Sequence, residues 1–391
     1  MIVVQSSLLI LLLLEKVIEQ TDISLEQQEV KGMPEIRVAL VGVGNSASAL
    51  IQGTQYYKNA EEGTTVPGLM HVNFGGYNIK DIKFVAAFEV NKDKIGKDLS
   101  EAIFMKPNCV VKFSDVPYLG VKVSSAPIMD GVAKHMEKVF NIYDEKKEGS
   151  ADIVKILKET KAEVLVNYLP VGSRMAARFY AQAAMDAGCA FVNCMPEFIG
   201  SNVDWAKKFE EAGLPVLGDD IKSQVGATIL HRNLVRLCID RGVIIDETYQ
   251  LNLGGDTDFL NMTVEERLHT KRISKTEAVT SLVPYDLPTR IGPSDYVHFL
   301  NNKKICYITL KGRKFGDRPI TINVKLEVED SPNSAGVVID LIRAAKIALD
   351  RKISGSLLSM PAYAFKHPPI QVPDSQARQW TEDWIAGKRE R

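Results

Sequence analysis

The sequence lacks the features that mark several classes of protein. Its formal net charge is -1, with 48 Lys and Arg against 49 Asp and Glu, so there is no overall attraction to a phosphate backbone and no nucleic-acid partner is expected. The cysteines are odd in number, scattered and free of CxxC spacing, which favours a reducing cytoplasm. No histidine has a paired ligand spacing, so a structural zinc site is not expected. The five cysteines and six histidines are Cys109, Cys189, Cys194, Cys238 and Cys306, and His71, His135, His231, His269, His298 and His367.

A membrane-spanning segment is also missing from the pattern. Residues 2–14 are almost wholly apolar, but a bilayer requires about 20 such residues. No basic residue precedes this stretch and no small-residue cleavage pattern follows it, so it is a poorly formed secretory signal. Met33 stands directly before the first convincing strand. We therefore expect residues 1–32 to be an extension that the fold does not need.

What is present is typical of an enzyme-sized globular chain of about two domains, with 391 residues, 45% hydrophobic and 25% charged. Residues 36–44, IRVALVGVG, form a buried-type strand, and residues 45–57 follow with a helical pattern. The turn between them has the GxGxxA spacing, in which glycines allow close backbone approach and the helix N-terminus faces a pyrophosphate. An ordinary glycine turn is the alternative. The cofactor-binding candidates of this turn are Gly42, Gly44, Asn45, Ser46 and Ala47.

The acidic partner of this fingerprint is expected at the end of the next strand. That strand, KFVAAFEV, reaches its acid at Glu89, later than usual because residues 58–81 read as an insertion. A carboxylate at this position accepts from ribose hydroxyls and disfavours a 2′-phosphate, so NAD is preferred over NADP. The alternative for Glu89 is an exposed charge at a strand end.

Further strand and helix patterns alternate through residue 220, which predicts a doubly wound parallel sheet with helices on both faces. Polar residues end several of these strands, at the edge where a ligand crevice forms. Each could instead cap the following helix. The strand-end residues are Asn167, Pro170, Asn193, Pro196, Asp219 and Asp220.

From residue 243 the pattern changes to alternating strands typical of an antiparallel sheet. Residues 334–353 return to a helical period and are expected to pack back on the first domain. The prediction is therefore a Rossmann-like domain over 33–242, an inserted α+β domain over 243–335, and a C-terminal segment, 336–391, that rejoins the first domain.

A short segment of the second domain concentrates lysines. If residues 262–280 are helical, Leu268, Lys271, Lys275 and Val279 lie along one stripe. A solvated surface is the plain interpretation of such charges. The apolar residues in the same stripe argue for a buried or half-buried face instead.

Several stretches together resemble the inositol-phosphate synthases, in particular their shorter archaeal-like and bacterial forms. They are GVGNSASAL, GDDIKSQVGATILHR, NLGGDTDFLNM with KRISKTEAVTS, SDYVHFLNNKKICYI, EDSPNSAG and AYAFKHPP, in this order from Ile36 to Pro369. The resemblance implies an NAD-dependent isomerase of inositol and phospholipid biosynthesis. It oxidises D-glucose 6-phosphate at carbon 5, forms an enolate, closes the ring by an aldol step and re-reduces the ketone, giving L-myo-inositol 1-phosphate.

The resemblance also assigns residues to roles, because ammonium groups stabilise oxyanions and move protons. In NNKK, either Lys303 or Lys304 could align, and Lys304 is chosen because it directly precedes the strand. The implied catalytic residues are Lys271, Lys275, Lys304, Lys366, Asp330 and Asp258. Lys222, Ser223 and Gln224 follow the strand-end aspartates, where donors at a helix start could hold the phosphate; an N-terminal helix cap is the alternative, and both can hold at once. The other substrate and phosphate contacts are Asn261, Lys275 and Lys304, and the cofactor set gains Asn91 and Ser331.

Two further expectations follow from the resemblance, one about a metal ion and one about assembly. A divalent cation is left open, because Asn302 stands where an acid is sometimes found in that loop. The family commonly forms homotetramers through the sheet-bearing domain.

Two other functions are the alternatives. One is an NAD-dependent dehydrogenase acting on a phosphorylated sugar or semialdehyde with net redox, and the other is a dinucleotide-sensing regulator without chemistry.

Overall fold

The structure is a computed structural model that describes residues 34–391, apart from the side chains of residues 293 and 294. Residues 36–391 form one compact unit. The predicted extension, residues 1–32, lies outside the described residues.

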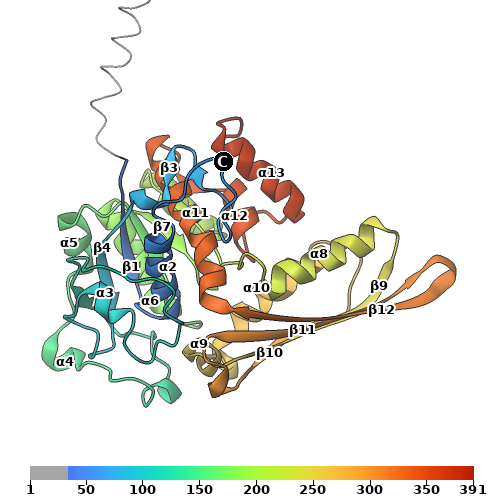
Figure 1. The fold of residues 1–391 in the computed structure, drawn as a ribbon, viewed down its shortest axis with the longest axis horizontal. Coiled ribbons are helices and arrows are strands. Elements are labelled where there is room, and N and C mark those ends of the chain that lie inside the picture. Colours follow the sequence, from blue (N-terminus) through green and yellow to red (C-terminus); the bar gives the residue numbers. More distant parts are fainter. Residues whose placement is uncertain (1–33) are drawn as a thin grey trace, which may run out of the picture. The chain divides into compact units, whose positions relative to one another are not determined.

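The larger of the two main sheets has seven strands, all paired in parallel, in the order β13-β8-β7-β6-β1-β4-β5 (Figure 1). Apart from the added strand β13, this is the 3-2-1-4-5-6 order of dinucleotide-binding folds. The predicted Rossmann-like sheet is therefore confirmed. Its strands are β1 (Ile36–Val41), β4 (Ile82–Glu89), β5 (Val123–Ser125), β6 (Val164–Asn167), β7 (Ala190–Asn193), β8 (Pro215–Leu217) and β13 (Gly355–Ser356).

Helices cover both faces of this sheet because its central strands are apolar on both sides. In β1, Val38 and Leu40 pack into one core with α2 and α11, whereas Ala39 and Val41 pack into the other with α5, α6 and α7. Burial on both faces is why β1 is apolar from Val38 to Val41. The helices are α2 (Asn45–Tyr56), α11 (Asp330–Asp350), α5 (Ile153–Glu159), α6 (Arg174–Ala187) and α7 (Val203–Glu211).

The second sheet has the order β10-β9-β11-β12, and α8 (Ala227–Asp240) and α10 (His269–Thr280) cover one of its faces. β11 pairs antiparallel with β9 and β12, as expected, but β10 pairs parallel with β9. The expectation of a purely antiparallel sheet is wrong there, because the chain between β9 and β10 crosses over through helices and returns in the same direction. The strands are β9 (Ile244–Gly254), β10 (Thr289–Tyr296), β11 (Lys303–Lys314) and β12 (Arg318–Glu329).

Two helices differ from their predicted bounds. The helix expected over 262–280 begins at His269, because α9 (Thr257–Asn261) and a 3-10 turn (Glu265–Arg267) precede it. Conversely, α11 begins at Asp330, four residues before the predicted start at residue 334. The helix includes Pro332 because this residue lies in the first turn, where a backbone N–H has no partner within the helix and its absence costs nothing. As expected, α11 packs against α2 and the first sheet.

The shorter elements complete the chain. The insertion between α2 and β4 holds the hairpin β2 (Asn73–Phe74) and β3 (Tyr77–Asn78), and after α11 the chain ends in α12 and α13. The strands β5, β10 and β13 were not anticipated from sequence. The boundaries at 242/243 and 335/336 stay predictions. The remaining helices are α3 (Leu99–Ala102), α4 (Glu145–Glu148), α12 (Ser359–Ala364) and α13 (Asp374–Ile385).

Candidate active site

A single cavity runs from the glycine turn after β1 to the lysines of the second sheet. At the first end, Gly42 has φ +89°, and a Cβ there would lie 3.0 Å from the backbone oxygen of Tyr168. Glycine is therefore required by both the conformation and the space. Gly44, Asn45 and Ser46 also line the cavity, at the N-terminus of α2. This is the geometry expected of a dinucleotide-binding turn.

The last residue of β4, Glu89, lies in the wall at this end. Its carboxylate accepts hydrogen bonds from the backbone N–H of Val43 at 2.9 Å and of Val90 at 2.7 Å. Close by, the buried ammonium of Lys94 donates to the carbonyl of Val43 at 2.7 Å and to the side chain of Asn108 at 2.8 Å. The alternative of a merely exposed strand-end charge does not describe Glu89, because its carboxylate braces the glycine turn.

At the other end, two of the expected lysines share one buried carboxylate. The ammonium groups of Lys271 and Lys366 lie 3.0 and 2.8 Å from the same oxygen of Asp220, which is fully buried and also accepts from the Ser274 hydroxyl. Burial would raise the pKa of Asp220, but the two ammonium groups hold it well below its usual range. Asp220 therefore remains a charged anchor that aims both lysines into the cavity.

The other two lysines differ in their partners. Lys304 lies 3.1 Å from Asp330, the first residue of α11, whereas within residues 34–391 Lys275 forms no ion pair. Burial, followed by repulsion from the other three lysines, lowers the pKa of Lys275 to about 7. Burial likewise lowers the pKa of Lys366 to about 8. Two of the four amines can thus exchange protons near neutral pH.

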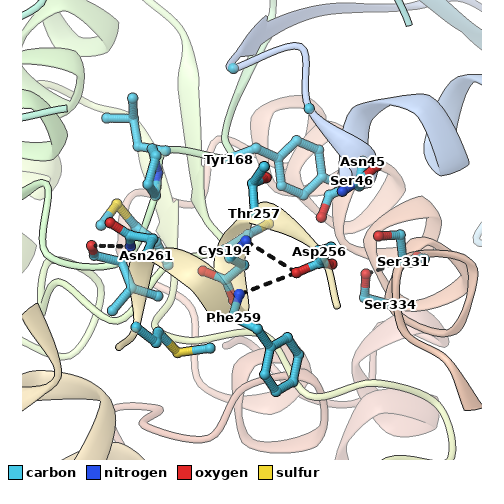
Figure 2. Close-up of a pocket in the computed structure, with 18 of the residues that line it drawn as sticks. Asn45, Ser46, Tyr168, Cys194, Asp256, Thr257, Phe259, Asn261, Ser331 and Ser334 are labelled. Carbon is cyan, nitrogen blue, oxygen red and sulfur yellow. Dashed lines mark hydrogen bonds between the residues drawn. The ribbon is translucent and has the colours of Figure 1, made fainter. Parts of the chain in front are cut away.

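Sequence reasoning missed Asp256, which lies in the cavity wall between α9 and the start of α11 (Figure 2). Its carboxylate accepts from the backbone N–H groups of Asp258 and Phe259 and from the side chain of Asn302. Burial, together with the neighbouring carboxylates Asp258 and Asp330, raises the pKa of Asp256 to about 7. The signal that could have found it is the N-cap position, because an aspartate directly precedes the short helix.

Four buried polar atoms of cavity-lining residues have no hydrogen-bond partner within residues 34–391. They are the hydroxyls of Tyr168 and Tyr180, the side-chain nitrogen of Asn252 and the side-chain oxygen of Asn261. Leaving such atoms unpaired costs about 1–3 kcal/mol each. A ligand rich in hydroxyl and amide groups would satisfy them, which supports a cavity built for polar small molecules.

The N-terminus of α8 also opens into the cavity. Ser223, Gly226, Ala227 and Thr228 line it, and Gly226 is the N-cap. The free backbone N–H groups of a helix start favour an anion. Ser223 was expected to contact phosphate, whereas Gly226 and Thr228 were not named from sequence.

The other expected site residues divide into two groups. Those that line the cavity, besides the ones already described, are Asn91, Pro170, Asp258, Asn261 and Ser331, and Lys304 lines it whereas the neighbouring Lys303 is exposed. Those that do not line it are Ala47, Asn167, Asp219, Asp220, Lys222 and Gln224.

Each of these six residues has a structural reason for its position. Ala47 is fully buried in α2, and Asn167 donates to Asn193 within the sheet. Asp220 acts behind the lysines. The ammonium of Lys222 is 2.9 Å from Asp374, and Gln224 donates to the carbonyl of Gly68 at 2.7 Å.

Asp219 is the sixth, and it is enclosed by donors. Its carboxylate accepts from Asn193, from the hydroxyl of Ser201 and from the backbone N–H groups of Ile199 and Gly200. Strand-end position alone predicted a ligand contact for Asp219 and Lys222, and the structure instead gives both a bracing position.

The histidines and cysteines contribute no further centre. His231 is buried between Thr248 and Gln250, and burial lowers its pKa to about 4. His269 is exposed at the start of α10. All five cysteines are free. Within the described chain, no group of three or more His, Cys, Asp or Glu side chains is placed to hold a metal ion.

The fold and this cavity define a two-sheet α/β enzyme with a dinucleotide-binding turn at one end and a cluster of buried lysines at the other. Comparison with known proteins makes the class specific. The family model described as myo-inositol-1-phosphate synthase matches residues 226–331. An inositol-3-phosphate synthase of Mycolicibacterium smegmatis is 55% identical over 360 residues, covering 90% of this chain and 98% of that protein.

Two more comparisons agree. An inositol-3-phosphate synthase of Corynebacterium glutamicum is 52% identical, with 90% of this chain and 98% of that protein covered. The crystal structure of a myo-inositol-1-phosphate synthase-related protein from Thermotoga maritima matches with a TM-score of 0.73 and 25% identity, over 90% and 98% of the two chains. The chain therefore belongs to the inositol-3-phosphate synthase family, as the sequence motifs indicated. None of the helices between residues 34 and 391 has the length and apolar character needed to cross a membrane.

Proposed function

We propose that this chain converts D-glucose 6-phosphate to L-myo-inositol 1-phosphate with a bound NAD. The observation that carries the proposal is the arrangement of four ammonium groups around two aspartates, Asp220 and Asp330, beside unpaired polar atoms of the cavity wall. With both aspartates ionised, positive charge exceeds negative charge among these six groups. That surplus suits a phosphorylated sugar that develops further negative charge as it reacts.

The residues of the first end fit a dinucleotide. The glycine turn and Ser46 would hold its pyrophosphate at the start of α2, Glu89 would face the ribose, and the unpaired hydroxyl of Tyr168 would meet its polar groups. When bound, NAD supplies the acceptance and return of one hydride. Glu89 braces the turn through Val43, so the preference for NAD over NADP is coupled to the shape of the turn.

The lysines provide what enolisation and aldol closure require. Lys271 and Lys304, each ion-paired to a carboxylate, are fixed cations for the oxygen atoms that become negative. Lys275 and Lys366 have pKa values lowered to about 7 and about 8, which suits the transfer of a proton to and from carbon or oxygen. Asp258 faces Lys271 and raises its pKa together with Asp220, although burial opposes them.

The phosphate is assigned to the start of α8. Ser223, Gly226 and Thr228 offer hydroxyl and backbone donors there, and Lys275, which forms no ion pair within residues 34–391, supplies an ammonium. The expected contact from Lys222 is replaced by these groups. Asn261, with its side-chain oxygen unpaired, is assigned to a sugar hydroxyl.

The proposal extends to assembly and location. Tyr249, Leu251 and Tyr307 are 38%, 43% and 41% exposed on the face of the second sheet opposite α8 and α10. We assign this face to the contacts of a homotetramer, which light scattering of the purified protein would check.

The free cysteines support a cytoplasmic location. A requirement for a divalent cation is checked by measuring activity with and without a chelator.

The test of the function is product identification. Incubation of the purified chain with carbon-13-labelled glucose 6-phosphate and catalytic NAD should give a cyclic inositol phosphate in carbon and phosphorus NMR, with no accumulation of NADH. Steady formation of NADH would instead identify a dehydrogenase with net redox. A protein that binds NAD but leaves the sugar phosphate unchanged would refute the enzyme assignment.

A further inference from the structure

The beginning of α11 is capped by Asn302, a residue of the turn that precedes β11. The backbone N–H of Asp330 donates to the carbonyl of Asn302 at 2.9 Å, and the N–H of Ser331 donates to the Asn302 side-chain oxygen at 3.0 Å. Both N–H groups belong to the first turn, which has no partners inside the helix, and no side chain of its own N-cap residue serves them. Asn302 therefore holds Asp330, the carboxylate that pairs with Lys304.

The orientation of the Asn302 amide is set in turn by Asp256. The side-chain nitrogen of Asn302 donates to Asp256 at 3.1 Å and to the Ser331 hydroxyl at 2.9 Å. The remaining oxygen of Asp256 accepts from the backbone N–H groups of Asp258 and Phe259 at 3.0 and 3.2 Å. The three groups that contact Asp256 all donate hydrogen bonds, so both oxygens of its side chain must accept.

This chain of bonds joins three segments of the site. Asp256 fixes the turn that carries Asp258, and Asn302 directly precedes the strand that carries Lys304. Asn302 bonds both to Asp256 and to the first turn of the helix that begins with Asp330 (Figure 2 shows the Asp256 and Ser331 ends). Asp256 is 7% exposed and Asn302 is 2% exposed, so water does not substitute for either partner. We propose that Asp256 is a positioning residue for the reaction, holding the Lys304–Asp330 pair in register through Asn302. The inference rests on the proposed function and adds a residue and a mechanism of support to it.

The direction of the hydrogen bonds makes this testable by a swap. In Asp256→Asn the new amide nitrogen faces the Asn302 nitrogen, and a flip of Asn302 only moves the clash of donors to the N–H of Ser331. In Asn302→Asp two carboxyl groups face each other, and a bond between them requires that one of them takes up a proton. In the double variant Asp256→Asn/Asn302→Asp the amide donates from residue 256 instead, and the carboxylate accepts from both the N–H and the hydroxyl of Ser331. Every bond of the network is regained, and the two bonds from residue 302 to residue 256 and to the Ser331 hydroxyl reverse their direction.

The experiment compares wild type, the two single variants and the swap for kcat and KM with glucose 6-phosphate. Each single variant should lose about tenfold to a hundredfold in kcat, the effect of a reacting group displaced by up to 1 Å, with KM changed less. The swap should recover to within about threefold of wild type, because every buried donor and acceptor of the network is satisfied again. Asp152→Asn is the control, since Asp152 is also a helix N-cap, its side chain accepting from the backbone N–H of Lys155 at 3.0 Å, but is exposed and outside the cavity.

The outcomes separate the inference from the function it rests on. Wild-type turnover is measured first, and a chain that forms no inositol phosphate overturns the proposed function. With an active wild type, normal kcat in Asp256→Asn overturns the positioning role. Equally low kcat in Asp256→Asn and in a folded, NAD-binding swap also overturns it, because the carboxyl group at 256 would then act directly. If Asp256→Asn does not fold, Asn302→Asp and the swap provide the same comparison.

Discussion

Binding of glucose 6-phosphate should be accompanied by uptake of a proton at Lys275. Its pKa is lowered to about 7 by burial and by three neighbouring lysines, so at pH 8 only about one molecule in ten carries the ammonium. A phosphate dianion placed beside it favours the charged form and raises the pKa again. We therefore expect uptake of up to about 0.9 proton per site from Lys275 at pH 8, with a smaller share from Lys366.

Isothermal titration calorimetry in two buffers of different ionisation enthalpy measures this uptake directly. In Lys275→Met most of the dependence on buffer should disappear, while in Lys303→Met, which removes an exposed ammonium one residue from Lys304, it should persist. Equal apparent enthalpies in both buffers for the wild type would refute the reasoning. Lys275 would then be charged before the substrate arrives.

The remaining predictions concern catalysis, cofactor binding and stability. Lys271→Ala and Lys304→Ala should each lower kcat by roughly a hundredfold, since one aimed oxyanion donor supplies about 2.7–4 kcal/mol. NAD binding measured by fluorescence should survive, and near-normal turnover would contradict the assigned roles. Gly42→Ala should abolish NAD binding, because the added methyl group lies 3.0 Å from a backbone oxygen at a positive φ; unchanged affinity would show that the turn adapts. His71 is 2.5 Å from Asp340, which raises its pKa although burial opposes it. This contribution to stability is present below pH 6.5 and lost as pH rises through the folded-state pKa, so the Tm should fall over that range in wild type and less in His71→Gln.

Periodicity and resemblance recovered much of the site because its residues stand in compact motifs. The glycine turn, Glu89 and all four lysines line one cavity. The position of the turn and of Glu89 follows from topology, because ligands bind at the carboxyl ends of parallel strands. The rule does not give side-chain direction. Asp219 and Lys222 follow β8, as predicted, yet one is enclosed by donors and the other is paired with Asp374 from the far end of the chain.

Sequence patterns do not predict residues whose importance depends on partners far away in the chain. Asp256 reads as an ordinary cap, and only the meeting of β11 and α11 beside it makes its carboxylate a bridge. Lys94 has no motif, and its burial against the glycine turn arises from the folding of the segment around it. Such residues belong to tertiary contacts between segments far apart in the chain, which a local pattern does not encode.

The position of α11 has a consequence for how the enzyme can move. Its first residue pairs with Lys304 at the substrate end, and the same continuous 21-residue helix then packs along α2, whose N-terminus forms the dinucleotide end. The separation of the two ends is therefore fixed by one rigid rod. A reaction that withdraws a hydride and later returns it to the same carbon needs an unchanged distance at both moments. In this chain α11 runs without a break, so it supplies no hinge between the two ends of the cavity.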